Sequence, residues 1–169
     1  MKECFIFLDV DGPINTHKNI LQNKLKNKPT SSYRIKLPTR QLERLATIVR
    51  ETNAKLILSS SWRLVNLRHS VGNISPARRN LESQLNLVGL SLSGQTPFIG
   101  NDRGLEINTW LDKYEYYNGY KPAYIIIDDN IDKIIRQHRG HIIYCDPNYG
   151  ITDKEMNIAI NLLLKQMEK

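Results

Sequence analysis

The chain has 169 residues and a formal net charge of +7, with 40 % hydrophobic and 24 % charged residues. No apolar run approaches the roughly 18 residues of a membrane-spanning helix, and the start, MKECFIFLDV, turns acidic too early for a signal peptide. We therefore expect a single globular domain over residues 1–169, cytoplasmic and without a membrane partner. Its two cysteines, Cys4 and Cys145, form no motif and are expected to be free thiols.

Apolar runs alternate with amphipathic stretches along the chain. Residues 5–8 (FIFL) are apolar throughout, which is typical of a strand buried on both faces of a parallel sheet. Residues 17–37 are polar and basic, and we expect them to be irregular. Residues 39–52 predict a helix whose apolar face is Leu42, Leu45, Ile48 and Val49. Residues 55–58 (KLIL) predict the second strand.

The second half continues the alternation. Residues 76–87 predict a helix, followed by a short strand near residues 88–92. Residues 103–115 predict a helix with an apolar face, and residues 123–127 (AYIII) predict a buried strand.

A short helix over residues 130–139, N-capped by Asn130, and a strand over residues 141–145 complete the sheet. Thr152 and Glu155 form a capping box that opens the final helix. The order predicts an α/β fold, a doubly wound, Rossmann-like parallel sheet with helices on both faces.

The excess positive charge lies in one segment. Residues 17–44 hold eight Lys and Arg residues and one acid, Glu43, so 8 − 1 = +7 accounts for the whole net charge. A localised basic patch favours a polyanionic partner. A solvated, Lys-rich loop that aids solubility is the alternative, and composition leaves both open.

Paired acids follow two of the predicted strands. Asp9 and Asp11 follow the first strand, and Asp128 and Asp129 follow the strand AYIII. Sites in such sheets form at the carboxyl ends of the strands, so the four carboxylates meet if these strands are neighbours. One Asp after a strand is usually a cap or a turn former, but two crowded pairs need a cation or a proton. Oxygen ligands beside a phosphate suit Mg²⁺.

The order of these motifs resembles the haloacid dehalogenase (HAD) superfamily of phosphohydrolases, and the resemblance runs from about residue 5 to 145. The four motifs are DVDG from Asp9, Ser59 after the second strand, the basic Arg103, and Asp128-Asp129. Lys is more usual than Arg at the third motif.

Within this superfamily the chain is similar to small phosphatase domains associated with RNA repair, including the Swiss Army Knife group. The similarity rests on SSSWR at 59–63, on a TP…RG.EI..WL pattern within residues 96–111, and on Gly-Ile-Thr at 150–152. Polynucleotide-end phosphatases share the DVDG and DD signatures. The resemblance therefore implies an HAD-like fold.

By this resemblance the chain is a Mg²⁺-dependent phosphomonoesterase. Asp9 is the expected nucleophile that forms an aspartyl-phosphate, and Asp11 is the expected acid and base. The implied Mg²⁺ ligands are the Asp9 carboxylate, the Asp11 backbone carbonyl and Asp128, with Asp129 assisting directly or through water. Ser59 is expected to bind a phosphoryl oxygen.

The remaining candidates are basic or polar. Arg103 is expected to stabilise the charge on the transferring phosphoryl group. Ser60 either donates its backbone N–H or belongs to a polar turn. Arg63 either clamps a phosphate bidentately or is a surface arginine whose neighbour, Trp62, packs on the core.

The expected substrate follows from a basic insert at about residues 13–38. This insert is too short for a large cap domain, so the site is open and admits a macromolecular end. Arg34 and Lys36 of the insert are candidate substrate contacts, and residues 62–80 add four basic residues and no acid: Arg63, Arg68, Arg78 and Arg79. We expect a phosphorylated nucleic-acid terminus as substrate.

Two alternatives remain: a phosphatase of nucleotides or other small phosphomonoesters, and a non-enzymatic phosphoaspartate receiver. A receiver is disfavoured because the middle strand KLIL ends in Ser and no Lys follows the last strand. The tyrosine-rich residues 114–124 lie before a strand start, so we expect them at the edge opposite the acids.

Overall fold

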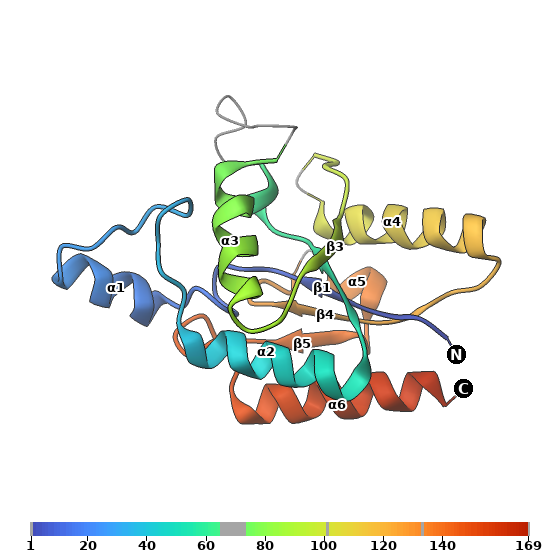
Figure 1. The fold of residues 1–169 in the computed structure, drawn as a ribbon. Coiled ribbons are helices and arrows are strands. Elements are labelled where there is room, and N and C mark those ends of the chain that lie inside the picture. Colours follow the sequence, from blue (N-terminus) through green and yellow to red (C-terminus); the bar gives the residue numbers. More distant parts are fainter. Residues whose placement is uncertain (1, 65–73, 101, 133, 169) are drawn as a thin grey trace.

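The computed structural model describes residues 2–64, 74–100, 102–132 and 134–168. Within these residues the fold is built on a five-stranded sheet with the order β3-β2-β1-β4-β5 (Figure 1). All neighbouring strands pair in parallel. The strands are β1 (Cys4–Leu8), β2 (Lys55–Leu58), β3 (Leu92–Gln95), β4 (Ala123–Asp128) and β5 (Ile142–Tyr144). The predicted doubly wound α/β fold is confirmed.

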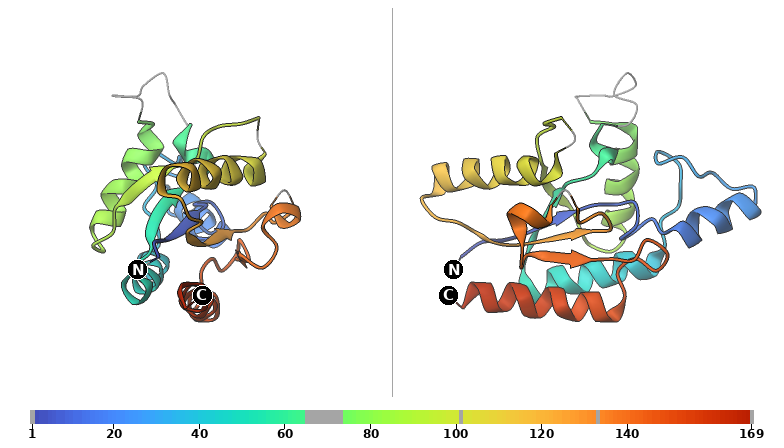
Figure 2. Two further views of the ribbon diagram at one scale, coloured as in Figure 1. Left: turned by 90° about the vertical axis from the view of Figure 1, so that its right-hand side faces the viewer. Right: turned by 180° about the vertical axis from the view of Figure 1, so that it is seen from behind.

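Helices cover both faces of the sheet (Figure 2). They are α1 (His17–Leu25), α2 (Thr39–Thr52), α3 (Pro76–Asn86), α4 (Arg103–Asn118), α5 (Ile135–His138) and α6 (Asp153–Met167), with a 3₁₀ turn η1 (Ser61–Arg63). Alternate strand residues point to opposite faces. Ile6 and Leu8 of β1 therefore pack in one cluster with α2, α3 and α6, whereas Phe5 and Phe7 pack against α4.

The pairing of β1 with both β2 and β4 aligns their carboxyl ends. Leu8 at the end of β1 lies opposite Leu58 of β2 and Ile127 of β4. The residues that follow these three strands therefore share one edge of the sheet, as the sequence predicted. We call this edge, with Asp9, residues 59–63, Arg103, Asp128 and Asp129, the acid edge.

The turn after β1 packs against the segment that opens α6. Ile151 N donates a hydrogen bond to the Pro13 carbonyl at 2.9 Å, and His17 N donates to the Pro147 carbonyl at 2.8 Å. Gly150 has φ +65°, and a Cβ there would lie 2.4 Å from the Pro13 oxygen, so this close approach needs glycine. The predicted capping box of α6 is present at Thr152 and Glu155.

Two local predictions were wrong. Residues 17–37 are not wholly irregular, because α1 forms there with Thr16 as its N-cap. The helix predicted over 130–139 is confined to Ile135–His138. Asn130 is not the N-cap, because the helix begins at Ile135 and the residue before it is Ile134. The Asn130 backbone N–H donates to Asp128 Oδ1 at 2.8 Å instead.

The strand expected near residues 88–92 lies at Leu92–Gln95 instead. No helix in the described part of the chain combines the length and the apolar character that a membrane crossing would require.

Candidate active site

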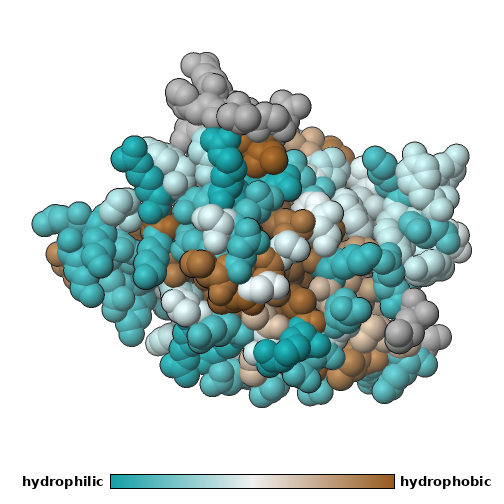
Figure 3. Space-filling model, viewed as in Figure 1, coloured by the Kyte–Doolittle hydropathy of each residue, from teal (hydrophilic) through white to brown (hydrophobic). Residues whose placement is uncertain are grey.

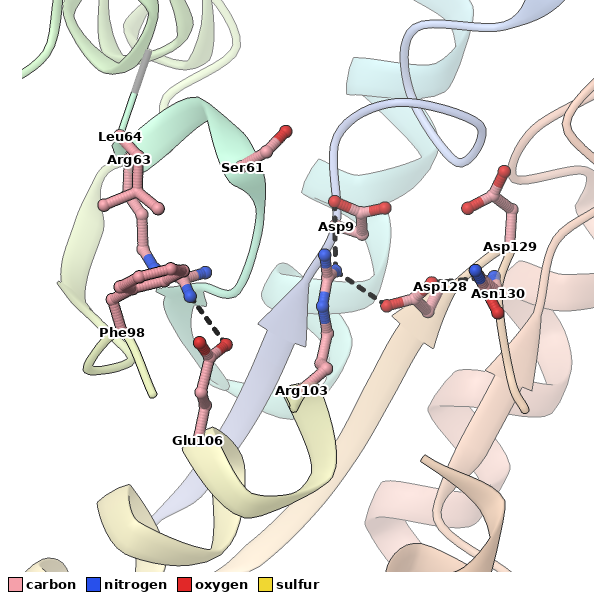
Figure 4. Close-up of a pocket in the computed structure, with 10 residues that line it drawn as sticks. All are labelled: Asp9, Ser61, Arg63, Leu64, Phe98, Arg103, Glu106, Asp128, Asp129 and Asn130. Atoms are coloured by element: carbon pink, nitrogen blue, oxygen red, sulfur yellow. Dashed lines mark hydrogen bonds and ion pairs between the residues drawn. The ribbon is translucent and has the colours of Figure 1, made fainter. Parts of the chain in front are cut away.

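The strand backbones fix the first residues of the acid edge. Asp9 N donates to the Ile127 carbonyl at 2.9 Å, and Ser59 N donates to the Leu8 carbonyl at 2.8 Å. A cavity of about 280 Å³ opens above these tips. Its lining comes from several elements (Figure 4): Asp9, Ser61, Arg63, Leu64, Phe98, Arg103, Glu106, Asp128, Asp129 and Asn130.

Three carboxylates converge on this cavity. Asp9, Asp128 and Asp129 each present an oxygen within 4.8 Å of the other two. Burial raises the pKa of Asp128 to about 7, and the negative charge of Asp9 adds to the effect. Burial also raises the pKa of Asp9, although Arg103 opposes the shift, and burial raises the pKa of Asp129. Such crowding favours any cation or proton that relieves it.

Arg103 is one such cation. Its Nη1 lies 3.1 Å from Asp9 Oδ1 and 2.8 Å from Asp128 Oδ2, and it also donates to the Ser59 carbonyl. Burial by itself would lower the pKa of Arg103, but Asp9 and Asp128 raise it above its usual value. Three ionised carboxylates and one guanidinium leave −3 + 1 = −2, so this set of oxygen donors fits one divalent cation such as Mg²⁺.

Asp11 lies beside this group rather than in it. Its Oδ2 accepts a hydrogen bond from the Trp62 indole Nε1 and its Oδ1 accepts one from Asn15 Nδ2, both at 2.8 Å. Gly12 has φ +88°, and a Cβ there would lie 2.4 Å from Asp129 Cγ, so only glycine fits between the two acidic pairs. The turn therefore brings Asp11 close to the cavity without placing its carboxylate in the cavity lining.

Ser59 supplies a buried hydroxyl. The residue is 1 % exposed, and its Oγ has no hydrogen-bond partner among the described residues. A buried polar atom without a partner costs about 1–3 kcal/mol, so this hydroxyl suits a bound phosphoryl oxygen. The Ser60 side chain instead hydrogen-bonds Asp9 and accepts from Trp62 N at 3.4 Å. Ser60 therefore has the turn role and also contacts Asp9.

A family model described as the HAD domain in Swiss Army Knife RNA repair proteins matches residues 5–156. The chain belongs to this family. Membership implies an HAD-type phosphatase, in agreement with the resemblance of the motifs. Comparisons with curated proteins and with solved structures found no match.

In this HAD domain Arg63 is neither an open clamp nor a surface residue. It is 4 % exposed, and its Nη2 forms a 2.6 Å ion pair with Glu106 Oε2 (Figure 4). Its Nη1 and Nη2 also donate to the carbonyls of Ser60 and Pro97 at 3.0 and 3.4 Å. Arg63 lines the cavity, but most of its donors are engaged. The partner, Glu106, belongs to the TP…RG.EI..WL pattern, but nothing in the sequence paired it with Arg63, 43 positions away.

Trp62 has two roles, of which the sequence indicated one. It is 1 % exposed and packs in the core, as expected. The sequence did not predict its hydrogen bond to Asp11, because the two residues are 51 positions apart and no local pattern indicates which group an indole N–H contacts.

The basic candidates of the insert lie elsewhere. Arg34 and Lys36 are exposed and do not line the acid cavity. The surface over α1, where the insert protrudes, is predominantly hydrophilic (Figure 3). Arg78 is held by Glu82 at 2.9 Å, and Arg68 lies outside the described residues. The structure thus brings together the candidates from the strand ends but not those from the insert.

The tyrosine-rich residues lie at the opposite edge, as expected. Ala123 N, at the start of β4, donates to the Glu3 carbonyl at 3.0 Å. The Tyr114 hydroxyl donates to the Glu3 carboxylate at 2.6 Å. These tyrosines are therefore remote from the phosphate chemistry.

Proposed function

We propose that the chain is a Mg²⁺-dependent phosphomonoesterase that acts through an aspartyl-phosphate on a phosphorylated nucleic-acid terminus. The observation that carries the proposal is the buried Asp9 at the tip of β1, within reach of Asp128 and Arg103. Family membership and the unpartnered hydroxyl of Ser59 support the same chemistry.

Asp9 is the proposed nucleophile. Its carboxylate oxygen forms a bond to phosphorus as the ester oxygen leaves, and water later breaks the acyl phosphate to release phosphate and restore Asp9. Asp11 gives a proton to the leaving oxygen and then takes one from the attacking water. The hydrogen bonds from Trp62 and Asn15 hold its carboxylate beside the cavity for both transfers.

Ser59 and Arg103 bind the phosphoryl group in this proposal. The Ser59 hydroxyl donates to one phosphoryl oxygen, and Arg103, held by Asp9 and Asp128, faces the charge that develops during transfer. Asp9, Asp128, Asp129 and the Asp11 carbonyl would hold Mg²⁺, which when bound offsets the repulsion between anionic substrate and anionic nucleophile.

The basic insert supports a nucleic-acid substrate. Its lysines are exposed and do not line the acid cavity, so they can track the phosphate backbone of a strand whose terminus lies in that cavity. The family description refers to RNA repair proteins. A mononucleotide is the second candidate, because the cavity of about 280 Å³ has the 53 % exposed ring of Phe98 in its wall, where one base can stack.

A panel of phosphorylated substrates tests the proposal. We expect release of phosphate from oligonucleotides with a 3′- or a 5′-phosphate, from mononucleotides and from an aryl phosphate, all abolished by a chelator and restored by Mg²⁺. A lower KM for oligonucleotides that disappears at high salt supports the nucleic-acid terminus. Equal KM values for oligonucleotides and mononucleotides favour the second candidate, and no phosphate release from any of them rejects the phosphatase.

A further inference from the structure

Helix α1 buries amides where a surface helix normally buries apolar side chains. Asn15, just before the helix, and Asn23 within it are 3 % and 8 % exposed, whereas Leu21 and Leu25 are 57 % and 77 % exposed. Buried amides persist only where they find hydrogen-bond partners. The partners of these amides therefore indicate what the inner face of α1 does.

The buried Asn15 and Asn23, with the half-buried Asn19 between them, form a chain of hydrogen bonds that ends on Asp11. Asn15, Asn19 and Asn23 are four residues apart, and we call them the asparagine ladder. Asn23 Nδ2 donates to the backbone carbonyl of Asn19 at 2.9 Å, and Asn19 Nδ2 donates to Asn15 Oδ1 at 3.1 Å. Asn15 Nδ2 then donates to Asp11 Oδ1 at 2.8 Å. Two side-chain hydrogen bonds thus connect Asn19 with the proposed acid.

The ladder also borders a basic groove of about 240 Å³. Its lining includes three lysines and no acid. The lining residues are Asn19, Gln22, Asn23, Lys26, Lys28, Lys36, Leu37, Pro38 and Thr39. Asn19 Nδ2 donates to the Lys36 carbonyl at 3.1 Å and so joins the two walls of the groove. Three cationic side chains around a polar hollow suit a phosphate of a nucleic-acid backbone.

We propose that this groove binds a backbone phosphate of the nucleic-acid strand and that the asparagine ladder connects its occupancy with the position of Asp11. The inference rests on the proposed function. A strand in the groove displaces Lys36 and Asn19 relative to each other, and Asn15 transmits the change to the Asp11 carboxylate. Asn15 and Asn19 are positioning residues, because they act through Asp11. A small ester does not reach the groove and gains nothing from it.

The indole signals of the protein provide a readout that needs no turnover. The chain has two tryptophans, so a ¹⁵N spectrum holds two indole N–H signals, and Trp110→Phe assigns that of Trp62. Because this indole donates to Asp11, its shift reports the position of that carboxylate. The probe is a single-stranded RNA of about ten nucleotides with hydroxyl ends, which has no terminal phosphate to hydrolyse.

We expect the probe to shift the Trp62 signal in the wild type. Asn19→Ala should bind the probe within about twofold of the wild type without that shift, whereas Lys26→Glu with Lys28→Glu should weaken binding about tenfold. Asn157→Ala is the matched control, because it removes an exposed amide from helix α6, outside the groove and the ladder, and it should keep the shift.

If the probe shifts the Trp62 signal equally in Asn19→Ala, the ladder does not connect the groove with Asp11. If Lys26→Glu with Lys28→Glu binds the probe as tightly as the wild type, the groove is not the binding site. In turnover, Asn19→Ala should lower kcat about tenfold for a phosphorylated oligonucleotide and less than twofold for an aryl phosphate; equal losses would reject a positioning role. Absence of phosphatase activity in the wild type would reject the proposed function alone, because the binding measurements do not depend on it.

Discussion

The acid edge and the basic insert are both rich in charged side chains, but these are buried and paired at the acid edge and exposed in the insert. At the acid edge Asp9 and Asp128 are buried, and Arg103 contacts both. In the insert the lysines and Arg34 are exposed, and none of them forms an ion pair with another described residue. Buried, paired charges suit chemistry at a fixed point, whereas exposed charges suit a mobile polyanion. Changes at the acid edge should therefore affect every substrate, and changes in the insert only polyanionic ones.

The largest effect is expected for the proposed nucleophile, Asp9. Asp9→Asn should lower kcat by at least about 10⁴-fold for oligonucleotides and aryl phosphate alike, because an amide has no carboxylate oxygen to form the acyl phosphate. Phosphate release measures the loss, and circular dichroism checks the fold. Asp112→Asn, an exposed aspartate of α4, is the control and should be neutral. Substantial residual activity in Asp9→Asn would reject the mechanism.

The next effect concerns stability at the acid edge. Glu106→Gln removes one partner of the buried Arg63–Glu106 pair and should lower the free energy of unfolding by about 3–5 kcal/mol. Glu82→Gln breaks the partly exposed pair with Arg78 and should cost about 1 kcal/mol or less. Urea unfolding compares the two variants, and similar losses would show that burial does not distinguish the pairs.

Arg103 should matter for turnover, and lysine, which is more usual at this motif, should be able to replace it. Arg103→Met should lower kcat by about 10²–10³-fold on all substrates, because it removes the donor that faces the transferring group. Arg103→Lys keeps the charge and should stay within about tenfold of the wild type. A methionine variant as active as the lysine variant would contradict an electrostatic role.

The insert should show the opposite selectivity. Lys24→Glu with Lys36→Glu should raise the KM for phosphorylated oligonucleotides about tenfold at low salt and leave aryl phosphate unchanged, because only the polyanion contacts the insert. The control pair, Lys121→Glu with Lys165→Glu, changes the net charge equally. The difference should shrink as salt screens the charges. Equal effects of the two pairs would show that only total charge matters.

The smallest effect is the pH dependence of metal binding. Because burial raises the pKa of Asp128 from 3.8 to about 7, the folded protein binds this proton more tightly than the unfolded chain. The stability that this proton contributes in the absence of metal is therefore fully present below about pH 4 and is lost as pH rises through about 7.

Mg²⁺ bound as proposed would replace that proton, so the increase in Tm that it causes should grow over the same range, by about 2–4 °C between pH 5.5 and pH 8. Calorimetry with Mg²⁺ and with NaCl of equal ionic strength measures this difference. A Tm increase independent of pH would show that Asp128 holds no such proton.

The sequence predicted the sheet and the acid edge because their signals are local. Each buried strand is an apolar run, and the acids and Ser59 directly follow the ends of such runs. Parallel pairing then places them together without any further information. The missed contacts, Trp62 with Asp11 and Arg63 with Glu106, join residues that are far apart in the chain.

Helix α1 was missed for a different physical reason. Its inner face packs the partly buried Ile20 against the core but otherwise holds amides that are satisfied by hydrogen bonds, so the sequence lacks the apolar period by which helices are recognised. The same amides line the groove and, through Asn15, connect α1 with Asp11. The helix that lacks the usual apolar period is therefore the one beside the groove for which we propose a binding role.

The contact of Gly150 and Ile151 with Pro13 makes the segment before α6 part of the support of the turn that carries Asp11. A protein shortened before Gly150 would lose the wall behind the turn that carries Asp11, even if the sheet itself survived. Removal of the segment from Gly150 onward would thus act on a turn more than one hundred positions upstream.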